Sequence, residues 1–500
     1  MCRTLRLPLA AAALACAASS SPSPPPAGGV VIPVLEHHAG PRRAGVYQDP
    51  ALTRGAVASY HPDPSFRAAL PGAIYAQPLY VPAAAGGRDL LLAATEQDQV
   101  GAFDPRTGAA VWTRSLGTPV PHSALPCGNI DPLGITGTPV VDAAARTVYL
   151  DAMTTPDGGV TKRHLLFALS VDDGSTRPGW PVDVGAALAG QATPFDPAVQ
   201  NQRGALALVG GRLWVPYGGH WGDCGDYRGW LVAVSLAHPS QLAAWHAGAR
   251  GGGTWGPSGV ASDGTQVYVA TGNTFGATAW AGGEAVLAFP ADQAPGASPA
   301  DWFAPANWRD LDGGDVDIGG TGPVLLDLPG ATPSALAVAL GKDGNLYLLD
   351  RTHLGGEGGA LRVAAVSSEE IINAAAVYTT AAGTYVVFRG TGVGCPAGAG
   401  DLTAVRVIPG APPDARVAWC AASGGRGSPI ATTVGGGAEV AVWVVGAEGD
   451  ERIRAYDGDT GAPVLPPQGV GGTVRRFQSP IVSAGRVYVA VDGGLRALSR

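Results

Sequence analysis

One phrase recurs along this chain of 500 residues and constrains its architecture. A β-branched and aromatic strand ends in an Ala-x-Asp sequence, a Thr-Gly turn follows, and a Trp closes the phrase. Residues 102–112 carry the clearest copy, and residues 455–461 repeat its first part. Weaker copies begin at Ala168, Ala233, Ala288, Tyr347, Ala404 and Ala497. Eight units of about 40–65 residues are typical of a β-propeller or a solenoid.

The strands within these units alternate apolar and polar side chains, as residues 266–269 and 486–489 show. No segment has the 3.6-residue period of a helix. Each unit therefore reads as a four-stranded antiparallel blade with the Trp on its fourth strand. The predicted fold class is all-β, an eight-bladed β-propeller.

The last unit is one strand short. Strands are predicted at residues 479–482, 486–491 and 495–498, and the sequence then ends at Arg500. Residues 59–66 precede the first blade, where a fourth strand would lie. We expect this N-terminal stretch to complete the eighth blade, because a closed ring leaves no strand edge free.

The composition agrees with many short strands. The 75 Gly and 43 Pro residues supply a tight turn about every ten residues, and 46% hydrophobic residues exclude disorder for most of the chain. Only 14% of residues are charged, which disfavours a coiled coil or a solvated helical array. The net charge of −8 argues against a nucleic-acid partner.

The N-terminus has the pattern of an export signal. Arg3 and Arg6 precede an apolar run at residues 7–15, which is too short to span a bilayer. Residues 13–16 resemble a bacterial lipobox, so Cys16 is a candidate for lipidation, with plain secretion as the alternative. The predicted protein is exported, to the periplasm, the outer membrane or the exterior, as a monomer that touches a membrane only through such an anchor.

Three segments follow from these patterns. Residues 1–16 form the signal peptide, residues 17–56 a flexible or irregular segment, and residues 57–500 the propeller.

Export places four cysteines in an oxidising compartment, which predicts two disulfides with three possible pairings. Loop positions favour Cys127 with Cys224 and Cys395 with Cys420. No Cys or His spacing typical of zinc is present.

Unusual polar residues gather on one predicted face. The loops between second and third strands and the links between blades emerge together there, and such loops commonly carry function. Of the two lysines, Lys162 and Lys342, the second lies on this face in a chain that otherwise uses Arg. The other residues placed there are His122, Cys127, Asn129, Asp131, His220, Asp223, Cys224, Asp226, Arg228, Trp255, Asn273, Asp310, Asp312, Asp315 and Asp317.

The repeat resembles that of the eight-bladed quinoprotein propellers, which bind pyrroloquinoline quinone (PQQ), over about residues 57–500. Three segments resemble PQQ-dependent dehydrogenases in particular. They are Thr254-Trp255-Gly256 with Asn273, residues 315–319, and residues 342–351. Outer-membrane assembly scaffolds share the same repeat, so the repeat alone does not imply an activity.

The resemblance implies roles for individual residues. Trp255 would stack on the quinone, Lys342 and Arg228 would contact the cofactor, and Asp317 would be the catalytic base. Asn273 would bind Ca²⁺, with Asp223 and Asp315 as further candidate ligands. A planar anionic quinone needs an aromatic surface and a cation, and Ca²⁺ prefers oxygen ligands.

The sequence also departs from those enzymes. Their calcium-binding Glu, four residues before an Arg-Gly-aromatic triplet, is replaced by Cys224 ahead of Arg228-Gly229-Trp230. Their pair of adjacent cysteines is absent as well.

The sequence therefore leaves two hypotheses open. One is an exported PQQ- and Ca²⁺-dependent alcohol or sugar dehydrogenase, active or relict, acting on a small molecule. The other is a non-catalytic scaffold that binds an envelope protein and needs neither cofactor. A hydrolase or lyase ranks last, because no motif supports it.

Overall fold

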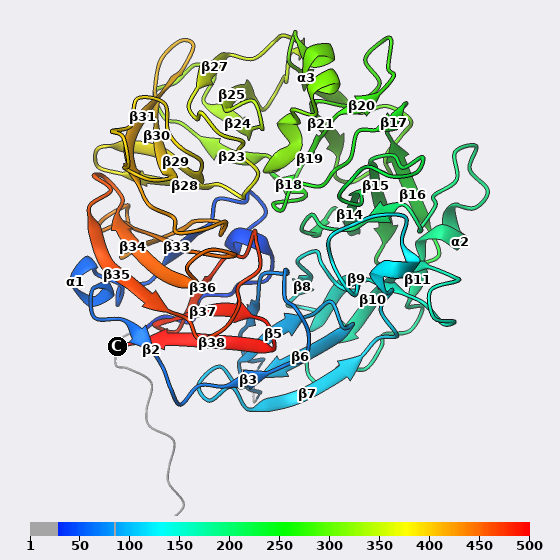
Figure 1. Ribbon diagram of the computed structural model, residues 1–500, viewed down its shortest axis with the longest axis horizontal. Helices are drawn as coiled ribbons and strands as arrows, with labels where there is room; N and C mark the ends of the chain where they lie inside the picture. The colour runs from blue at the N-terminus through cyan, green and yellow to red at the C-terminus, as the bar shows by residue number, and fades with distance from the viewer. Residues whose placement is uncertain (1–28, 85–86) are drawn as a thin grey trace, which may run out of the picture.

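The computed structural model describes residues 29–84 and 87–500. Eight antiparallel sheets stand around a common axis, each with its first strand nearest the axis, and confirm the predicted eight-bladed β-propeller (Figure 1). The signal-peptide residues and Cys16 lie outside the described part of the chain. Within that part, no helix is long and apolar enough to cross a membrane.

The blades follow the chain in order. Blade 1 contains β4 (Leu79–Val81), β5 (Leu90–Ala94), β6 (Gln99–Phe103) and β7 (Ala110–Ser115). Blade 2 contains β8 (Val140–Asp142), β9 (Thr147–Thr154), β10 (Arg163–Ser170) and β11 (Val182–Asp183). Blade 3 contains β13 (Ala207–Val209), β14 (Arg212–Gly219), β15 (Trp230–Ser235) and β16 (Leu242–His246). Blade 4 contains β18 (Ala261–Ser262), β19 (Gln266–Thr271), β21 (Ala285–Pro290) and β22 (Asp301–Ala304).

The second half of the ring repeats this plan. Blade 5 contains β23 (Val324–Asp327), β24 (Ala335–Leu340), β25 (Asn345–Asp350) and β27 (Arg362–Ala365). Blade 6 contains β28 (Ala376–Thr380), β29 (Gly383–Arg389), β30 (Leu402–Ile408) and β31 (Asp414–Ala421). Blade 7 contains β32 (Ile430–Thr433), β33 (Ala441–Val445), β34 (Arg452–Asp457) and β35 (Pro463–Gly469). Blade 8 contains β36 (Ile481–Ser483), β37 (Arg486–Val491) and β38 (Gly494–Ser499).

Short elements extend these blades. The additional strands are β12 (Gln200–Asn201), which pairs with β14, β17 (Arg250–Gly251), which pairs with β20 (Thr274–Phe275), and β26 (Gly356–Glu357), which runs parallel to β22. The helices are α1 (Arg54–Val57), α2 (Val184–Leu188) and α3 (Trp308–Gly314), and the 3-10 turns are His37–Ala39, His122–Ala124 and Ile318–Gly320.

The N-terminal stretch closes the ring as predicted. Strands β2 (His61–Pro62) and β3 (Ala68–Ala69) pair with β38, the last strand of the chain. His61 lies opposite Ser499 and Ala68 opposite Leu495. The outer edge of blade 8 is thereby covered by residues from the other end of the sequence.

The repeated phrase joins neighbouring blades. Trp419 at the end of blade 6 donates its indole N–H to the carbonyl of Gly458 in the blade 7 turn, at 2.9 Å. Asp457 holds that turn, because its Oδ1 accepts hydrogen bonds from the N–H and hydroxyl of Thr460. Trp112 and Val171 repeat the same contact between blades 1 and 2. The Asp, Thr, Gly and Trp of the phrase are therefore the parts of one inter-blade contact.

A strap made of residues 30–49 runs around the axis inside the ring, where Figure 1 shows the blue N-terminal segment. Its strand β1 (Val46–Gln48) pairs in parallel with β32. Its backbone also exchanges hydrogen bonds with the inner strands or adjoining turns of seven blades, at Tyr80, Val141, Ser262, Leu325, Val377, Ala431 and Ala484. Little of the strap is regular secondary structure, and these contacts hold it in place.

Arg43 lies at the centre of the strap with no exposed surface. Its guanidinium donates to the carbonyls of Val260 and Leu206, at 2.6 and 2.8 Å, and pairs with Glu36 at 2.9 Å. A buried guanidinium needs several such partners to offset its loss of hydration. Arg43 thus ties the strap to blades 3 and 4.

Substituting Gly461 should destabilise the ring. Its φ is +71°, and a Cβ there would lie 2.7 Å from the indole of Trp419. We expect Gly461→Ala to lower the free energy of unfolding by about 1–3 kcal/mol, from left-handed strain and overpacking. Thermal unfolding checks this against Gly469→Ala, where a Cβ would meet no atom within 4 Å. Equal melting temperatures for the two variants would contradict the inter-blade role of the turn.

Replacing a buried, protonated carboxyl group should stabilise the protein at alkaline pH. Asp98 in blade 1 is fully buried, neither carboxyl oxygen has a described hydrogen-bond partner, and burial with nearby Glu96 raises its pKa to about 9. The folded state therefore holds a proton that the unfolded state loses near pH 4, so wild-type stability falls as pH rises from about 4 to 9.

We expect Asp98→Asn to gain about 1–3 kcal/mol at pH 8.5 and much less at pH 4.5. Thermal melts at both pH values measure this, with the exposed Asp292→Asn as the matched control. A gain that is the same at both pH values would show that Asp98 is not protonated in the folded protein.

Candidate functional site

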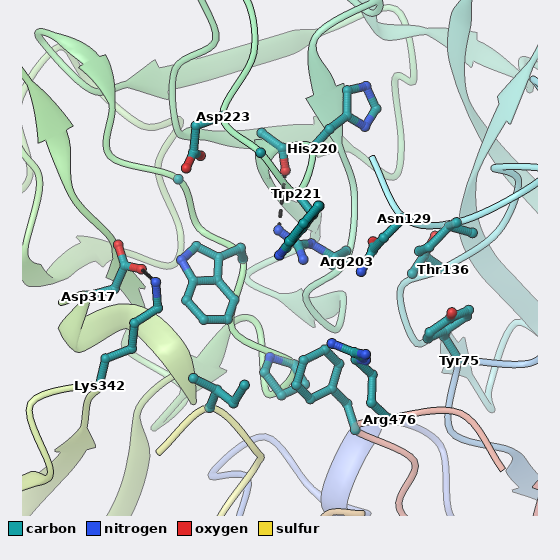
Figure 2. A pocket seen from close by; sticks show the side chains of 18 of the residues that line it. Tyr75, Asn129, Thr136, Arg203, His220, Trp221, Asp223, Asp317, Lys342 and Arg476 are labelled. Carbon is teal, nitrogen blue, oxygen red and sulfur yellow. Dashed lines mark hydrogen bonds and ion pairs between the residues drawn. The ribbon is translucent and has the colours of Figure 1, made fainter. Parts of the chain in front are cut away.

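A cavity of about 460 Å³ opens on the face where the polar loops were predicted to meet (Figure 2). Residues of the links between blades, of loops after second strands, and of the strap line it together. Six of the predicted site residues are among them: Asp223, Trp255, Asn273, Asp315, Asp317 and Lys342. Further lining residues used below are His37, Asn129, Arg203, Trp221 and Arg476. The sequence pattern thus brings residues from distant parts of the chain to one place.

Trp255 forms an aromatic wall of this cavity. The preceding residue, Thr254, is buried and donates its hydroxyl to the carbonyl of Tyr217 at 2.8 Å, which fixes the backbone. Two cations flank the indole: Arg203 Cζ and Lys342 Nζ each lie 5.5 Å from its ring centroid. Cations at this range interact favourably with the indole face.

Asp317 is buried at the cavity wall and bound from two sides. Its Oδ2 lies 2.5 Å from Lys342 Nζ, and its Oδ1 accepts the backbone N–H of Asn273 at 2.6 Å. Lys342 also donates to Asp315 Oδ1 at 3.1 Å. The 3-10 turn that begins at Ile318 and the end of β24 place the two charged groups face to face.

Gly272 makes this close approach possible. A Cβ at this position would lie 2.2 Å from Asp317 Oδ1 and 2.9 Å from the indole nitrogen of Trp255. Only glycine leaves room for both side chains at the end of β19. The Thr-Gly-Asn sequence therefore serves the site through its glycine and the backbone N–H of Asn273.

The pKa values follow from burial and charge. Burial raises the pKa of Asp317, and the ammonium of Lys342 only partly offsets it. Burial alone would lower the pKa of Lys342, but Asp317 and Asp315 hold it above its ordinary value. Behind them, burial and the Asp317 charge raise the pKa of Glu284 to about 10, so Glu284 stays protonated at neutral pH. Asp317 is therefore a buried carboxylate of the site whose pKa is higher than that of an exposed aspartate.

Arg203 is a functional candidate that the sequence reasoning missed. Its Nε is sealed from solvent without a hydrogen-bond partner, and its one described hydrogen bond goes to the carbonyl of Gly219, at 3.3 Å. In the described part of the chain no carboxylate lies within ion-pair distance of it, and burial lowers its pKa. Its position in the link from blade 2 to blade 3 is the only signal that could have indicated it.

A charged group with so few partners is costly to bury. Arg476, across the cavity in Figure 2, already pairs with Glu448 at 2.7 Å. Arg203 is thus a buried cation for which an anion entering the cavity would supply the missing partner.

The predicted calcium ligands lie on the cavity wall but do not form a ligand set. Asp223 Oδ1 accepts the Tyr227 hydroxyl at 2.7 Å, and the Asp315 side chain is 63% exposed. Among residues 29–84 and 87–500, no cluster of three or more His, Cys, Asp or Glu side chains could hold a metal. The Lys342 ammonium, held by Asp317, supplies positive charge at this place. The residues as arranged do not fit Ca²⁺.

The cysteines pair as favoured from the sequence, as Cys127–Cys224 and Cys395–Cys420. The first disulfide joins the link between blades 1 and 2 to the loop that carries Trp221 and Asp223, with a Cα–Cα distance of 6.1 Å. Asn129 and Trp221 both line the cavity, and Trp221 is 62% exposed. This disulfide therefore fixes two walls of the cavity mouth relative to each other.

Arg228 lies away from the cavity. Its side chain donates to the carbonyl of Ala247 at 3.1 Å, within blade 3, and it is not among the lining residues. Its role in cofactor binding stays a prediction.

His220 does line the cavity. Its Nε2 forms a hydrogen bond with the carbonyl of Ala198 at 3.1 Å, and burial lowers the pKa of the His220 ring to about 4.

No protein-family model and no curated protein matches the chain. Solved structures do match it. A quinohemoprotein alcohol dehydrogenase from Pseudomonas putida HK5 aligns with a TM-score of 0.64 at 15% identity, over 93% of this chain and 75% of that one. A europium-containing methanol dehydrogenase aligns at 0.61 and 15%, over 93% and 89%. BamB from Moraxella catarrhalis aligns at 0.50 and 15%, over 87% and 98%.

Structural similarity at 15% sequence identity establishes the fold of this chain. Its activity has to be inferred from the residues of the site. The chain has the eight-bladed propeller fold that these quinoprotein dehydrogenases share with BamB.

Proposed function

We propose that the protein is an exported quinoprotein-like propeller whose cavity binds a planar, anionic quinone of the PQQ class and oxidises an alcohol or sugar. The observation that best supports this proposal is the arrangement around Trp255, where Arg203 Cζ and Lys342 Nζ each lie 5.5 Å from the centroid of the indole ring. An aromatic wall suits a flat ring system, and two cations suit its negative groups. The two disulfides support export, because such bonds persist in oxidising compartments.

The residues present fit the quinone and not the metal. Trp255 offers the stacking surface, Arg203 an unpaired guanidinium, and Lys342 an ammonium at the cavity wall. When bound, the quinone would supply a two-electron acceptor for the hydride of the substrate. Because Ca²⁺ has no ligand set here, the proposal assigns it no step.

Asp317 would act as the base in this proposal. Its raised pKa suits a carboxylate that must accept the hydroxyl proton of an alcohol at neutral pH. Lys342 and the Asn273 N–H hold its two oxygens, so they orient the carboxylate. Trp221 and the Cys127–Cys224 loops would restrict the approach of water from the mouth.

A second candidate is a non-catalytic scaffold in the cell envelope. The likeness to BamB supports it, since this chain covers 98% of that propeller. The lack of a three-ligand metal cluster in the described residues supports it too. In that case the cavity would bind no quinone, and a protein partner would occupy this face.

Quinone binding separates the two candidates. We expect PQQ to quench the tryptophan fluorescence of the exported chain without added metal. Arg203→Ala should weaken its affinity about 10- to 100-fold, because a charge-assisted hydrogen bond is lost. Arg416→Ala, whose side chain is 74% exposed on blade 6, is the matched control. No quenching at saturating PQQ, with or without Ca²⁺, would remove the quinone proposal and favour the scaffold.

The base is tested by turnover. We expect Asp317→Asn to lower dye-linked alcohol oxidation about 10²- to 10⁴-fold, while PQQ still binds, because the amide accepts no proton. The exposed Asp310→Asn on α3 should keep wild-type turnover. Full activity in Asp317→Asn would exclude Asp317 as the base. Substrates to screen are primary alcohols and aldose sugars, with an artificial electron acceptor.

A further inference from the structure

The strap contributes a residue to the cavity. His37 is among the lining residues although it lies more than 160 residues before Arg203 in the sequence. It begins the 3-10 turn His37–Ala39, and its ring stacks on that of His38, with centroids 4.2 Å apart and planes inclined by 9°. His38 adopts a φ of 54°, so the strap bends sharply where it presents the two rings.

The two stacked rings have different partners. His38 is anchored, since its Nε2 meets Ser479 Oγ at 2.9 Å and its backbone N–H donates to Gln77 Oε1 at 3.0 Å. His37 makes no side-chain hydrogen bond within the described residues. Its Nδ1 is sealed from solvent, whereas its Nε2 is not. The strap therefore positions His37 by stacking and backbone contacts and leaves Nε2 for the cavity.

The surroundings of Nδ1 select the tautomer. A buried N–H without a partner costs more than a buried lone pair without one, and a neutral imidazole carries one N–H. The proton therefore belongs on Nε2. Burial, His38 and Arg43 all lower the pKa of His37 well below its ordinary value, so the ring stays neutral.

We propose that His37 donates a hydrogen bond from Nε2 to an oxygen of the molecule that the cavity binds. The site is then built from two parts of the chain, the loops between strands and the strap inside the ring. A carbonyl or carboxylate oxygen on a flat ligand would meet His37 from the strap, Arg203 from the link before blade 3, and Lys342 from blade 5. This inference rests on the proposed function and specifies which ligand atoms the site recognises.

Binding by variants tests the donor. The probes are PQQ and 8-anilino-1-naphthalenesulfonate, a flat aromatic anion that does not depend on quinone chemistry. We expect His37→Ala to weaken the affinity for the probes about 5- to 10-fold, as for one lost hydrogen bond. His37→Gln should recover most of it, because the amide N–H also donates. His164→Gln is the matched control, since His164 is equally buried but neither lines the cavity nor stacks on His37.

Packing effects are separated by melting temperature. If His37→Ala and His164→Gln lower the melting temperature alike but only His37→Ala weakens binding, the donor role stands. If both weaken binding equally, or neither does, the role is overturned.

The tautomer gives a readout that needs no ligand. In ¹H–¹⁵N spectra of histidine-labelled protein, the signals absent from His37→Ala belong to His37. We expect a neutral ring protonated at Nε2. A ring protonated at Nδ1 would overturn the inference whatever binds. If wild-type protein binds neither probe, the proposed function fails, and the spectra alone decide the state of His37.

Discussion

Closing eight blades into one ring leaves space along the axis, and the filling of that space determines the rest of this structure. The inner strands are only two to five residues long in this chain, as β18 and β28 illustrate. The strap fills the axis and bonds to seven blades in turn. Because the strap runs around the axis against the inner strands, it also lines the cavity of about 460 Å³ that opens on one face, through His37.

Burial sets the charge of that cavity. Buried carboxyls without an ion-pair partner among the described residues, such as Glu284, keep their protons, because ionised groups are poorly solvated inside a protein. Asp317 has an ammonium partner, whereas Arg203 has no carboxylate partner among the described residues. The described wall thus holds the Asp317–Lys342 pair beside Arg203, which favours a ligand that brings a negative group to Arg203.

Local patterns predicted the ring and half of the site. The Asp, Thr and Gly of each turn are visible in the sequence because they lie within a few positions of one another and recur in several blades. The contact itself joins one copy to the next, as Trp419 of blade 6 and the Gly458 turn of blade 7 show. Asp317 and Lys342 were found because one lies just before a recognisable strand and the other just after one, in segments that resemble the PQQ-dependent dehydrogenases. Arg203 and His37 were missed, since neither belongs to a repeated phrase. Their roles come from long-range packing, which a single sequence does not display.

The division of the site between loops and strap has a physical consequence. Loops at the mouth can vary without disturbing the blades, and the Cys127–Cys224 disulfide limits how far they move. His37 cannot move in that way, because the strap that carries it is bonded to the inner strands and anchored by buried Arg43. The wall at the axis is therefore rigid and the mouth adaptable. In the proposed function, the rigid wall would bind the flat, charged part of the ligand, and the loops at the mouth would contact the substrate.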